Sequence, residues 1–342
     1  MARLKQFLPA SLRSRVRHSR IYYTYNLLML RNRLLNAPKG ITIELTDRCN
    51  LKCSYCPKGS GIGLAGDDID FELFKLIVDE AIKLKAEQIA LVGFGEPLLY
   101  SRLIEAIHHI KSNYSSVRTY LTTNGTLLDE QMSIAIINSG LDQMTISVNF
   151  DSRQKYSEQN GFDVFDHVVE NTKAFLRLLN REGSYRKPQT RIQILAGLNS
   201  PYEIDAFREF WTPYLAPNAI IQVQPLVNWA GQVDVESNKE EFQRYPCTHL
   251  RNSWIITREG NALACCMVFP FNERNELMLG NIRISNSLRQ LYFEGRIAQM
   301  RKDNMDCNHD RMPTCRMCDA YRTVPNIYIR NPLHPLVGNK WF

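Results

Sequence analysis

Residues 41–56, ITIELTDRCNLKCSYC, decide how the chain is organised. The segment begins as a short apolar strand and continues directly into a C-x3-C-x2-C array formed by Cys49, Cys53 and Cys56. Three thiolates this close together in one loop suit one face of an iron-sulfur cubane, whose irons bind cysteine sulfur. Three ligands leave one iron without a protein ligand, and an open position is what distinguishes a catalytic metal site from a closed structural one.

A zinc knuckle is the alternative for this loop. Structural zinc takes four protein ligands, and no histidine lies within the loop or just after it to complete such a set. The chain has nine cysteines, an odd count, in a sequence of 342 residues with 44% hydrophobic residues. A core of that size and the lack of a secretory signal pattern indicate reduced thiols available for metal rather than disulfides.

Beyond the opening segment, short apolar runs alternate with stretches of helical period, which is the pattern of repeated β-α units around a parallel sheet. The predicted strands are residues 41–45, 88–92, 118–122, 143–148, 191–195 and 220–224. The helices predicted between them are residues 71–84, 101–112, 129–138, 165–180 and 202–211. Six such units predict an α/β fold, a partial (β/α)6 TIM-like barrel whose functional groups gather where the strands end.

The pattern changes after Pro225. A strand pair is predicted at 254–257 and 262–266 around Glu259-Gly260, followed by the segment Leu279-Gly280-Asn281-Ile282 and a helix over 287–301. Long irregular stretches here would be poorly held without a metal. We therefore predict three parts: a basic arm (1–40), a core barrel (41–230) and a small C-terminal iron-sulfur module (231–342).

Together, the first cysteine loop and the strand ends that follow it resemble the radical S-adenosylmethionine (SAM) superfamily, whose motif C-x3-C-x-Φ-C has an aromatic Φ, here Tyr55. The resemblance runs from Ile41 to Pro225. It implies that the three cysteines hold a [4Fe-4S] cluster and that SAM binds the fourth iron through its amino and carboxylate groups. An electron from the cluster then cleaves SAM, and the 5'-deoxyadenosyl radical abstracts a substrate hydrogen.

The resemblance also implies further SAM contacts after successive strands. The segment Gly93-Phe94-Gly95-Glu96-Pro97 is similar to the family's GGEP turn, with Phe94 in place of a glycine. Related sequences often carry an Arg-Gly after the fourth strand to pair the SAM carboxylate, whereas this chain has Asn160-Gly161. The expected cofactor-binding residues are Tyr55, Gly95, Glu96, Pro97, Thr123, Asn124, Ser147 and Asn149.

The later cysteines resemble the SPASM and twitch modules of radical SAM enzymes, in the pattern C-x12-G-x4-C followed by C-x2-C. The match is closer to the single-cluster twitch type, because no cysteine follows Cys318. It implies that Cys247, Cys265, Cys315 and Cys318 hold an auxiliary [4Fe-4S] cluster; a four-cysteine zinc ribbon is the alternative. Cys307 is either a replacement ligand or a buried thiol.

Strand alternation predicts that Cys266 points to the face opposite Cys265. From that face, the Cys266 thiol could give a hydrogen atom to a substrate radical, which would make it a catalytic residue for epimerisation. A protein-ligated auxiliary cluster could instead take an electron from the substrate radical, which would lead to dehydrogenation. The residues leave both outcomes open.

The net charge of +7 belongs to the arm, which carries nine Lys or Arg and no acidic residue. As a basic amphipathic helix the arm could lie on anionic lipid or grip a phosphorylated substrate, and its alternative is a helix packed across the open barrel with solvated arginines. No nucleic-acid motif is recognisable. With no apolar run near the roughly 20 residues of a membrane span, we expect a cytoplasmic protein.

These features predict a radical SAM oxidoreductase or epimerase, of the dehydrogenase/epimerase type, that acts on an unactivated carbon of a small-molecule or glycan-type, sugar-like substrate. Its electrons would come from a reductant such as flavodoxin or ferredoxin. A maturase that modifies a peptide or protein, by crosslinking, epimerisation or sulfatase-type oxidation, is the second enzyme hypothesis. A zinc-binding scaffold or nucleic-acid adaptor is the non-enzyme alternative.

Overall fold

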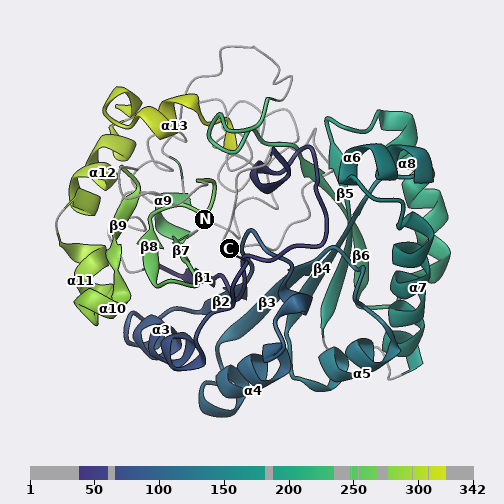
Figure 1. The fold of residues 1–342 in the computed structure, drawn as a ribbon, viewed down its shortest axis with the longest axis horizontal. Helices are drawn as coiled ribbons and strands as arrows, with labels where there is room; N and C mark the ends of the chain where they lie inside the picture. The colour runs from purple at the N-terminus through teal and green to yellow at the C-terminus, as the bar shows by residue number, and fades with distance from the viewer. Residues whose placement is uncertain are drawn as a thin grey trace, which may run out of the picture.

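A computed structural model describes residues 38–60, 66–181, 188–234, 247, 249–252, 254–268, 276–294, 296–306 and 308–320. The predicted basic arm, up to residue 37, and Cys307 lie outside the described residues. Figure 1 shows a curved, open sheet with helices along its outer side. No helix in the described part of the chain is long and apolar enough to cross a membrane.

Six parallel strands form the barrel: β1 (Gly40–Ile43), β2 (Gln88–Leu91), β3 (Arg118–Thr123), β4 (Gln143–Asn149), β5 (Gln189–Ala196) and β6 (Ala219–Pro225). They pair in sequence order, and β6 ends the sheet instead of closing on β1. The connecting helices are α3 (Phe71–Lys83), α4 (Leu103–Asn113), α5 (Glu130–Asn138), α7 (Phe165–Arg181) and α8 (Pro201–Trp211). The predicted partial (β/α)6 fold is confirmed, and all of these elements lie within two residues of their predicted ends.

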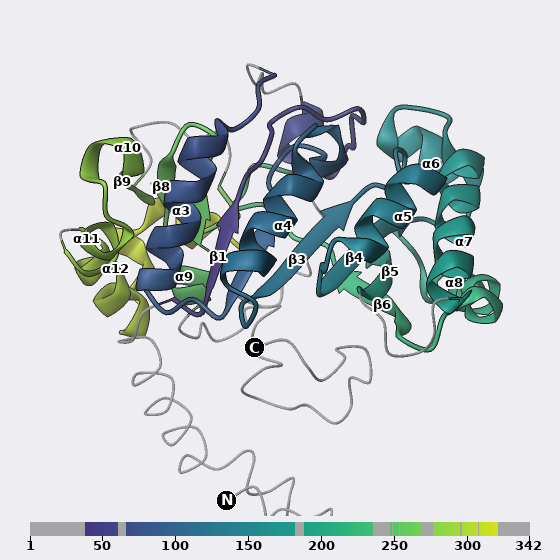
Figure 2. The same ribbon diagram turned by 90° about the horizontal axis from the view of Figure 1, so that it is seen from below.

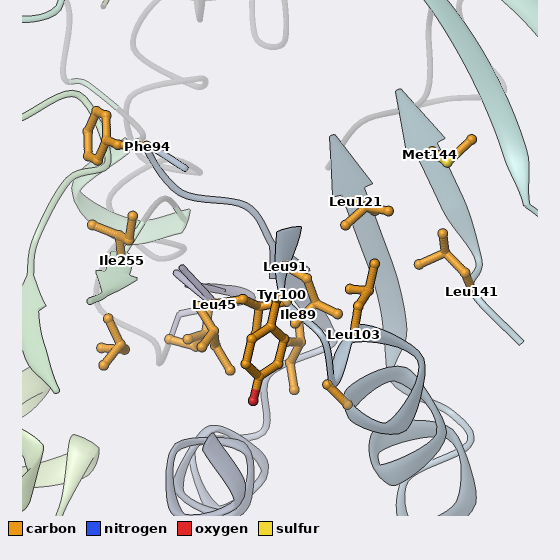
Figure 3. Close-up of a cluster of buried hydrophobic side chains, with 14 of the residues drawn as sticks. Leu45, Ile89, Leu91, Phe94, Tyr100, Leu103, Leu121, Leu141, Met144 and Ile255 are labelled. Carbon is orange, nitrogen blue, oxygen red and sulfur yellow. The ribbon is translucent and has the colours of Figure 1, made fainter. Parts of the chain in front are cut away.

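The helices begin where capping side chains are available. Asp70 accepts a hydrogen bond from the Leu73 amide at the start of α3, and Ser200 and Glu203 form a reciprocal capping box at the start of α8. Each helix then buries its apolar stripe against the sheet. Figure 3 shows the resulting core, where Leu91 and Leu121 of the strands meet Leu103 of α4. The core thus lies between the sheet and the helices, and it leaves the inner strand face available for function.

One helix of the barrel was not predicted. α6 (Arg153–Asn160) follows β4 and buries only Tyr156 and Asn160 among its eight residues. Its sequence, RQKYSEQN, lacks the apolar repeat from which the other helices were predicted. It ends at Gly161, which adopts a left-handed φ of 77°. Figure 2 shows α6 next to α7, at the end of the molecule away from β8 and β9.

The C-terminal strands extend the barrel sheet. β7 (Trp254–Ile256) pairs in parallel with β1, and β8 (Asn261–Leu263) and β9 (Met278–Asn281) continue antiparallel, so that nine strands form one sheet. The remaining short elements are η2 (Pro57–Ser60), η3 (Pro97–Leu99), η4 (Thr212–Tyr214), α9 (His249–Asn252), α10 (Ile282–Ser285), α11 (Leu288–Phe293), α12 (Arg296–Met305), η5 (His309–Arg311) and α13 (Pro313–Met317).

Two sequence predictions for this module are wrong in detail. The single helix expected over 287–301 is divided into α11 and α12, because Glu294 takes an extended backbone after α11. The strand expected over 262–266 ends at Leu263, so Cys265 and Cys266 lie in a turn beyond it. The second difference affects the interpretation of Cys266.

Candidate active site: two cysteine sets

The first cysteine loop follows β1 at the carboxyl end of the sheet, where functional groups of such barrels gather. The Cys56 amide donates to the Cys53 carbonyl at 3.1 Å, and the Gly59 amide donates to the Cys56 carbonyl at 2.9 Å. A Cβ on Gly59 would lie 1.8 Å from the Cys53 carbonyl oxygen, so only glycine fits there. These contacts wind the loop tightly and bring its three cysteines onto one short segment.

The thiols of this loop lie in an environment that disfavours a lone negative charge. Burial raises the pKa of Cys53 to about 12, and burial also raises the pKa of Cys49 and of Cys56. A cationic metal cluster reverses this effect, since it stabilises the thiolate form outright. The donor set therefore fits an iron-sulfur cluster.

The turn after β2 packs against the cysteine loop. The Glu96 amide donates to the Arg48 carbonyl at 2.7 Å, and a Cβ on Gly95 would lie 2.2 Å from the Thr46 carbonyl oxygen. Glycine at this position is therefore required for the close approach of two backbones. Pro97, also predicted to contact the cofactor, is buried at the start of η3.

The Glu96 side chain is buried and joins two loops. Its carboxylate accepts hydrogen bonds from the Thr123 hydroxyl at 2.7 Å, the Asn124 amide at 2.8 Å and the Leu98 amide at 3.1 Å. Burial raises the pKa of Glu96 to about 7. Both carboxylate oxygens therefore have partners within the protein, and the Glu96 side chain holds the loops after β2 and β3 together.

Asn124 continues this connection toward the first cysteine loop. Its side-chain amide donates to Asn50, the residue after Cys49, at 2.9 Å. Asn50 in turn donates to the Thr126 hydroxyl at 2.7 Å. The predicted residues Glu96, Thr123 and Asn124 thus form one connected network beside the cysteines.

Tyr55 lies between the cysteine loop and the end of β4. Its hydroxyl donates to Asn160 at 2.7 Å and accepts from the Asn149 side chain at 3.0 Å. Asn149 adopts a left-handed φ of 67° and is also bound by Gln193 at 3.2 Å. Ser147, on the same strand, lies 3.5 Å from the Gln193 side-chain nitrogen. The structure thus brings Tyr55, Ser147 and Asn149 together.

The second cysteine set surrounds a small cavity of about 30 Å³. Its lining includes all four predicted ligands, Cys247, Cys265, Cys315 and Cys318, together with His249 and His309. The Asn304 side chain accepts from the Cys247 amide at 2.8 Å and donates to the Cys247 carbonyl at 2.9 Å. Burial raises the pKa of Cys247, and a hydrogen bond with the neighbouring Cys266 thiol raises that of Cys265. This donor set also fits an iron-sulfur cluster. Among the described residues, no three His, Cys, Asp or Glu side chains converge as the ligands of a single ion do.

The prediction that Cys266 points away from Cys265 is wrong. The two thiols form a hydrogen bond, and Cys266 lies close enough to Cys247 to influence the pKa of its thiol. The reason is that β8 ends at Leu263, so the alternation of a strand does not extend to these residues. Cys266 therefore lies beside Cys265 but is not one of the residues that line the cavity.

Arg258 joins the C-terminal hairpin to the first cysteine loop. Its guanidinium pairs with Asp47 at 2.9 Å, and the exposed fractions of the two side chains are only 12% and 3%. Glu44 reinforces this joint by accepting from the amides of Arg258 at 3.3 Å and Phe94 at 3.2 Å. These contacts link the hairpin that leads to Cys265 with the segment that leads to Cys49.

Trp229 joins the same two regions from the other side. Its indole N–H donates to the Tyr55 carbonyl at 3.0 Å, and its ring packs on Phe94 with centroids 5.7 Å apart. The neighbouring Asn228 bonds with Asp319 and with the Met317 carbonyl, next to Cys318. The sequence predictions included neither Trp229 nor Arg258, because each acts through contacts distant in sequence.

Comparison with known proteins identifies the class of this site. Residues 43–200 match the radical SAM superfamily, and residues 247–319 match an iron-sulfur cluster-binding domain, SPASM. The chain therefore contains a radical SAM domain, followed by a SPASM-type domain. Its cofactors are SAM, a SAM-binding [4Fe-4S] cluster and an auxiliary [4Fe-4S] cluster. This assignment replaces the alternatives of a zinc site and of a non-enzyme protein. The role of each cysteine as a ligand stays a prediction.

The curated relatives carry different activities. A GTP 3',8-cyclase of Chlorobaculum tepidum is 31% identical over 205 residues, which are 58% of this chain and 57% of that protein. A PqqA peptide cyclase of Granulibacter bethesdensis is 34% identical over 113 residues, 33% of this chain and 29% of that protein. The matches thus span less than two thirds of either relative.

Solved structures share the fold. BtrN in complex with AdoMet and 2-DOIA aligns with a TM-score of 0.56 at 16% identity, over 83% of this chain and 94% of BtrN. Streptococcus suis SuiB bound to the precursor peptide SuiA aligns with a TM-score of 0.60 at 15% identity, over 81% of this chain and 70% of SuiB. At these identities the likeness shows the architecture alone.

Proposed function

We propose that this chain is a radical SAM oxidoreductase that removes hydrogen from an unactivated carbon of a small, polar, sugar-like substrate. The observation that carries the proposal is the polar inner face of the barrel. Most strand residues that face the helices are apolar, whereas the row that alternates with them is largely polar and includes Tyr120, Thr122, Thr145, Ser147, Arg191, Gln193, Gln222 and Gln224. Hydroxyl and amide groups of this kind recognise a ligand rich in hydroxyls.

Contacts along this face support the same substrate class. The Thr122 hydroxyl donates to that of Tyr120 at 2.7 Å, and the Tyr120 hydroxyl donates to Thr145 at 3.0 Å. The Gln222 side chain donates to Gln224 at 3.0 Å on the neighbouring edge. A polar ligand can form hydrogen bonds with the remaining donors and acceptors of these groups, whereas an apolar ligand would only remove those donors and acceptors from water.

The placement of Cys266 favours oxidation over epimerisation. Epimerisation needs a thiol that faces the substrate and returns a hydrogen atom, and the Cys266 thiol is instead hydrogen-bonded to Cys265. A cluster held by Cys49, Cys53 and Cys56 would, together with SAM, supply hydrogen-abstracting radical chemistry, and a cluster held by Cys247, Cys265, Cys315 and Cys318 would supply an electron acceptor. Oxidation also releases one proton to a base and requires an external one-electron donor such as flavodoxin or ferredoxin.

Peptide maturation is the second candidate, and the likeness to PqqA peptide cyclase over 113 residues favours it. A single experiment separates the candidates. Reconstituted, reduced protein would be incubated anaerobically with SAM and, in turn, a deuterated aminocyclitol or amino sugar, deuterated GTP and deuterated peptides. We expect deuterium in 5'-deoxyadenosine from the cyclitol or sugar and no 5'-deoxyadenosine from Cys53→Ala. Transfer from peptides alone would overturn the substrate proposal, and no 5'-deoxyadenosine from fully loaded protein would overturn the reaction itself.

A further inference from the structure

Tyr156 of α6 is buried beside the first cysteine loop and takes no part in the predicted site. Its exposed fraction is 1%, and its hydroxyl has no hydrogen-bond partner among the described residues. A buried hydroxyl without a partner has lost its hydrogen bonds to water without replacing them, which destabilises the fold. Such a group in a native fold calls for a ligand that satisfies it.

The surroundings of the phenol show what kind of ligand this is. The Tyr156 ring is held by Phe150, with centroids 6.3 Å apart and planes at 90°, and by Phe165 at 5.5 Å. The hydroxyl interacts electrostatically with Cys53, Cys49 and Glu96. The aromatic side of the residue is therefore fixed, and its polar end lies within electrostatic range of Cys49, Cys53 and Glu96.

The backbone of α6 is fastened to the same loop. The Lys52 amide donates to the Asn160 carbonyl at 3.0 Å, and the Ser54 amide donates to the Gln159 carbonyl at 2.8 Å. With the hydrogen bond from Tyr55 to Asn160, three contacts join the end of α6 to the segment between Cys49 and Cys56. Tyr156 thus lies on an element that has a fixed position relative to the first cluster.

We propose that the Tyr156 hydroxyl donates a hydrogen bond to the carboxylate of bound SAM, in place of the arginine that related sequences carry after the fourth strand. SAM offers one anionic group, its carboxylate, and a neutral O–H donor binds an anionic acceptor more strongly than a neutral one. The sulfonium and ammonium groups of SAM are cationic and cannot accept. Asn160 and Gly161, which stand at the Arg-Gly position, are committed to the Tyr55 contact and to the left-handed end of α6.

The test compares the wild type and Tyr156→Phe, and measures the binding of SAM and of decarboxylated SAM to each. Tyr156→Phe keeps the ring contacts and removes only the hydroxyl, and decarboxylated SAM lacks only the carboxylate. The dissociation constant of each ligand is measured anaerobically on protein with equal iron content, by following the EPR signal of the reduced first cluster. Tyr114→Phe is the matched control, because the Tyr114 hydroxyl bonds Asp79 on α3 and lies outside both cysteine sets.

We expect Tyr156→Phe to bind SAM about tenfold or more weakly, as for the loss of one hydrogen bond to a charged group. The affinity for SAM divided by the affinity for decarboxylated SAM should fall by the same factor. In Tyr114→Phe, both the affinity for SAM and this ratio should stay unchanged. An equal loss for both ligands, or no loss for either, would overturn the inference. A shift in cluster potential with unchanged SAM affinity would also overturn it, since the hydroxyl would then serve a cysteine sulfur.

If Tyr156→Phe failed to hold the first cluster, the ligand comparison would be made with Tyr156→His, which restores a neutral N–H donor on a ring. Retained discrimination between SAM and its decarboxylated form would support the inference, and lost discrimination would overturn it. The inference rests on the SAM site and not on the proposed substrate. Its failure would therefore leave the deuterium-transfer experiment unaffected.

Discussion

At the scale of single residues, buried carboxylates organise the loops around the first cluster. Glu96 and Glu44 each have exposed fractions below 4%, and burial raises the pKa of each to about 7. Backbone hydrogen bonds to each carboxylate oppose this increase and lower the pKa less than burial raises it. The protein thus tolerates two buried acids because each joins loops that are distant in sequence.

This burial predicts a pH dependence of stability. The usual pKa of Glu96 is 4.5 and its folded value is about 7, so the folded state holds a proton that the unfolded chain releases between these values. The contribution of Glu96 to the free energy of unfolding is therefore fully present below pH 4.5. As pH rises through 7, this contribution falls by about 3 kcal/mol. Glu44 titrates in the same window. Hence the unfolding free energy of Glu96→Gln should fall by about 3 kcal/mol less than that of the wild type between pH 4.5 and 8.

Anaerobic urea unfolding between pH 4.5 and 8 measures the slope of unfolding free energy against pH. Glu72→Gln is the control, because the Glu72 side chain lies at the surface of α3 with an exposed fraction of 77%. It should keep the wild-type slope. If Glu96→Gln also kept that slope, burial of Glu96 would not be the source of the pH dependence.

At the scale of elements, the first cysteine loop depends on a close backbone approach. Any side chain on Gly59 would collide with the Cys53 carbonyl, and backbone atoms cannot yield as a flexible side chain does. The loop is further fixed from outside by α6 and by the indole of Trp229. Its shape is therefore a property of several elements rather than of the loop alone.

Gly59→Ala should consequently lose the first cluster and keep the auxiliary one. We expect iron content to fall from about eight to about four atoms per chain, and 5'-deoxyadenosine formation to fall more than about a hundredfold. Iron and sulfide analysis of anaerobically reconstituted protein measures the change. Ser54→Ala, an exposed substitution in the same loop, should retain both clusters. Full iron content in Gly59→Ala would show that the close contact of Gly59 with the Cys53 carbonyl is not required for binding the first cluster.

At the scale of the whole molecule, one sheet carries both cysteine sets. The β7–β8 hairpin is paired to β1, and the buried pair of Arg258 and Asp47 fixes it there. Breaking such a pair by removing one partner costs about 3–5 kcal/mol. The auxiliary set is therefore attached to the barrel through hydrogen-bonded strands as well as through surface contacts.

The barrel itself should not depend on the auxiliary cluster. The core side chains that Figure 3 labels come from the barrel and from β7, and none of them is a cysteine of the second set. We expect Cys315→Ser with Cys318→Ser to lose about four irons, keep SAM cleavage and lose substrate oxidation. Iron analysis, 5'-deoxyadenosine and substrate product would be measured on one preparation, with Cys53→Ala as the reciprocal control. Oxidised product from the double variant would show that the auxiliary cluster is not the electron acceptor.

The sequence by itself determined the barrel, its element boundaries and the two cysteine patterns. These follow from local rules: apolar period distinguishes strands from helices, and cysteine spacing within one loop describes a ligand set. Gly95, Glu96, Thr123 and Asn124 were predicted from the resemblance to the radical SAM superfamily, and the structure places them at the ends of β2 and β3, where the ends of parallel strands meet at one edge.

Only the tertiary structure decided which distant groups meet. α6 has no apolar repeat, because its helix is held by contacts with the cysteine loop, and Tyr156 therefore left no periodic signal. The contacts of Trp229 and Arg258 join residues that are 174 and 211 positions apart, so no local pattern records them. Cys266 was misplaced for the same reason: the end of β8 is set by its pairing with β7 and β9, and not by the residues around the cysteine.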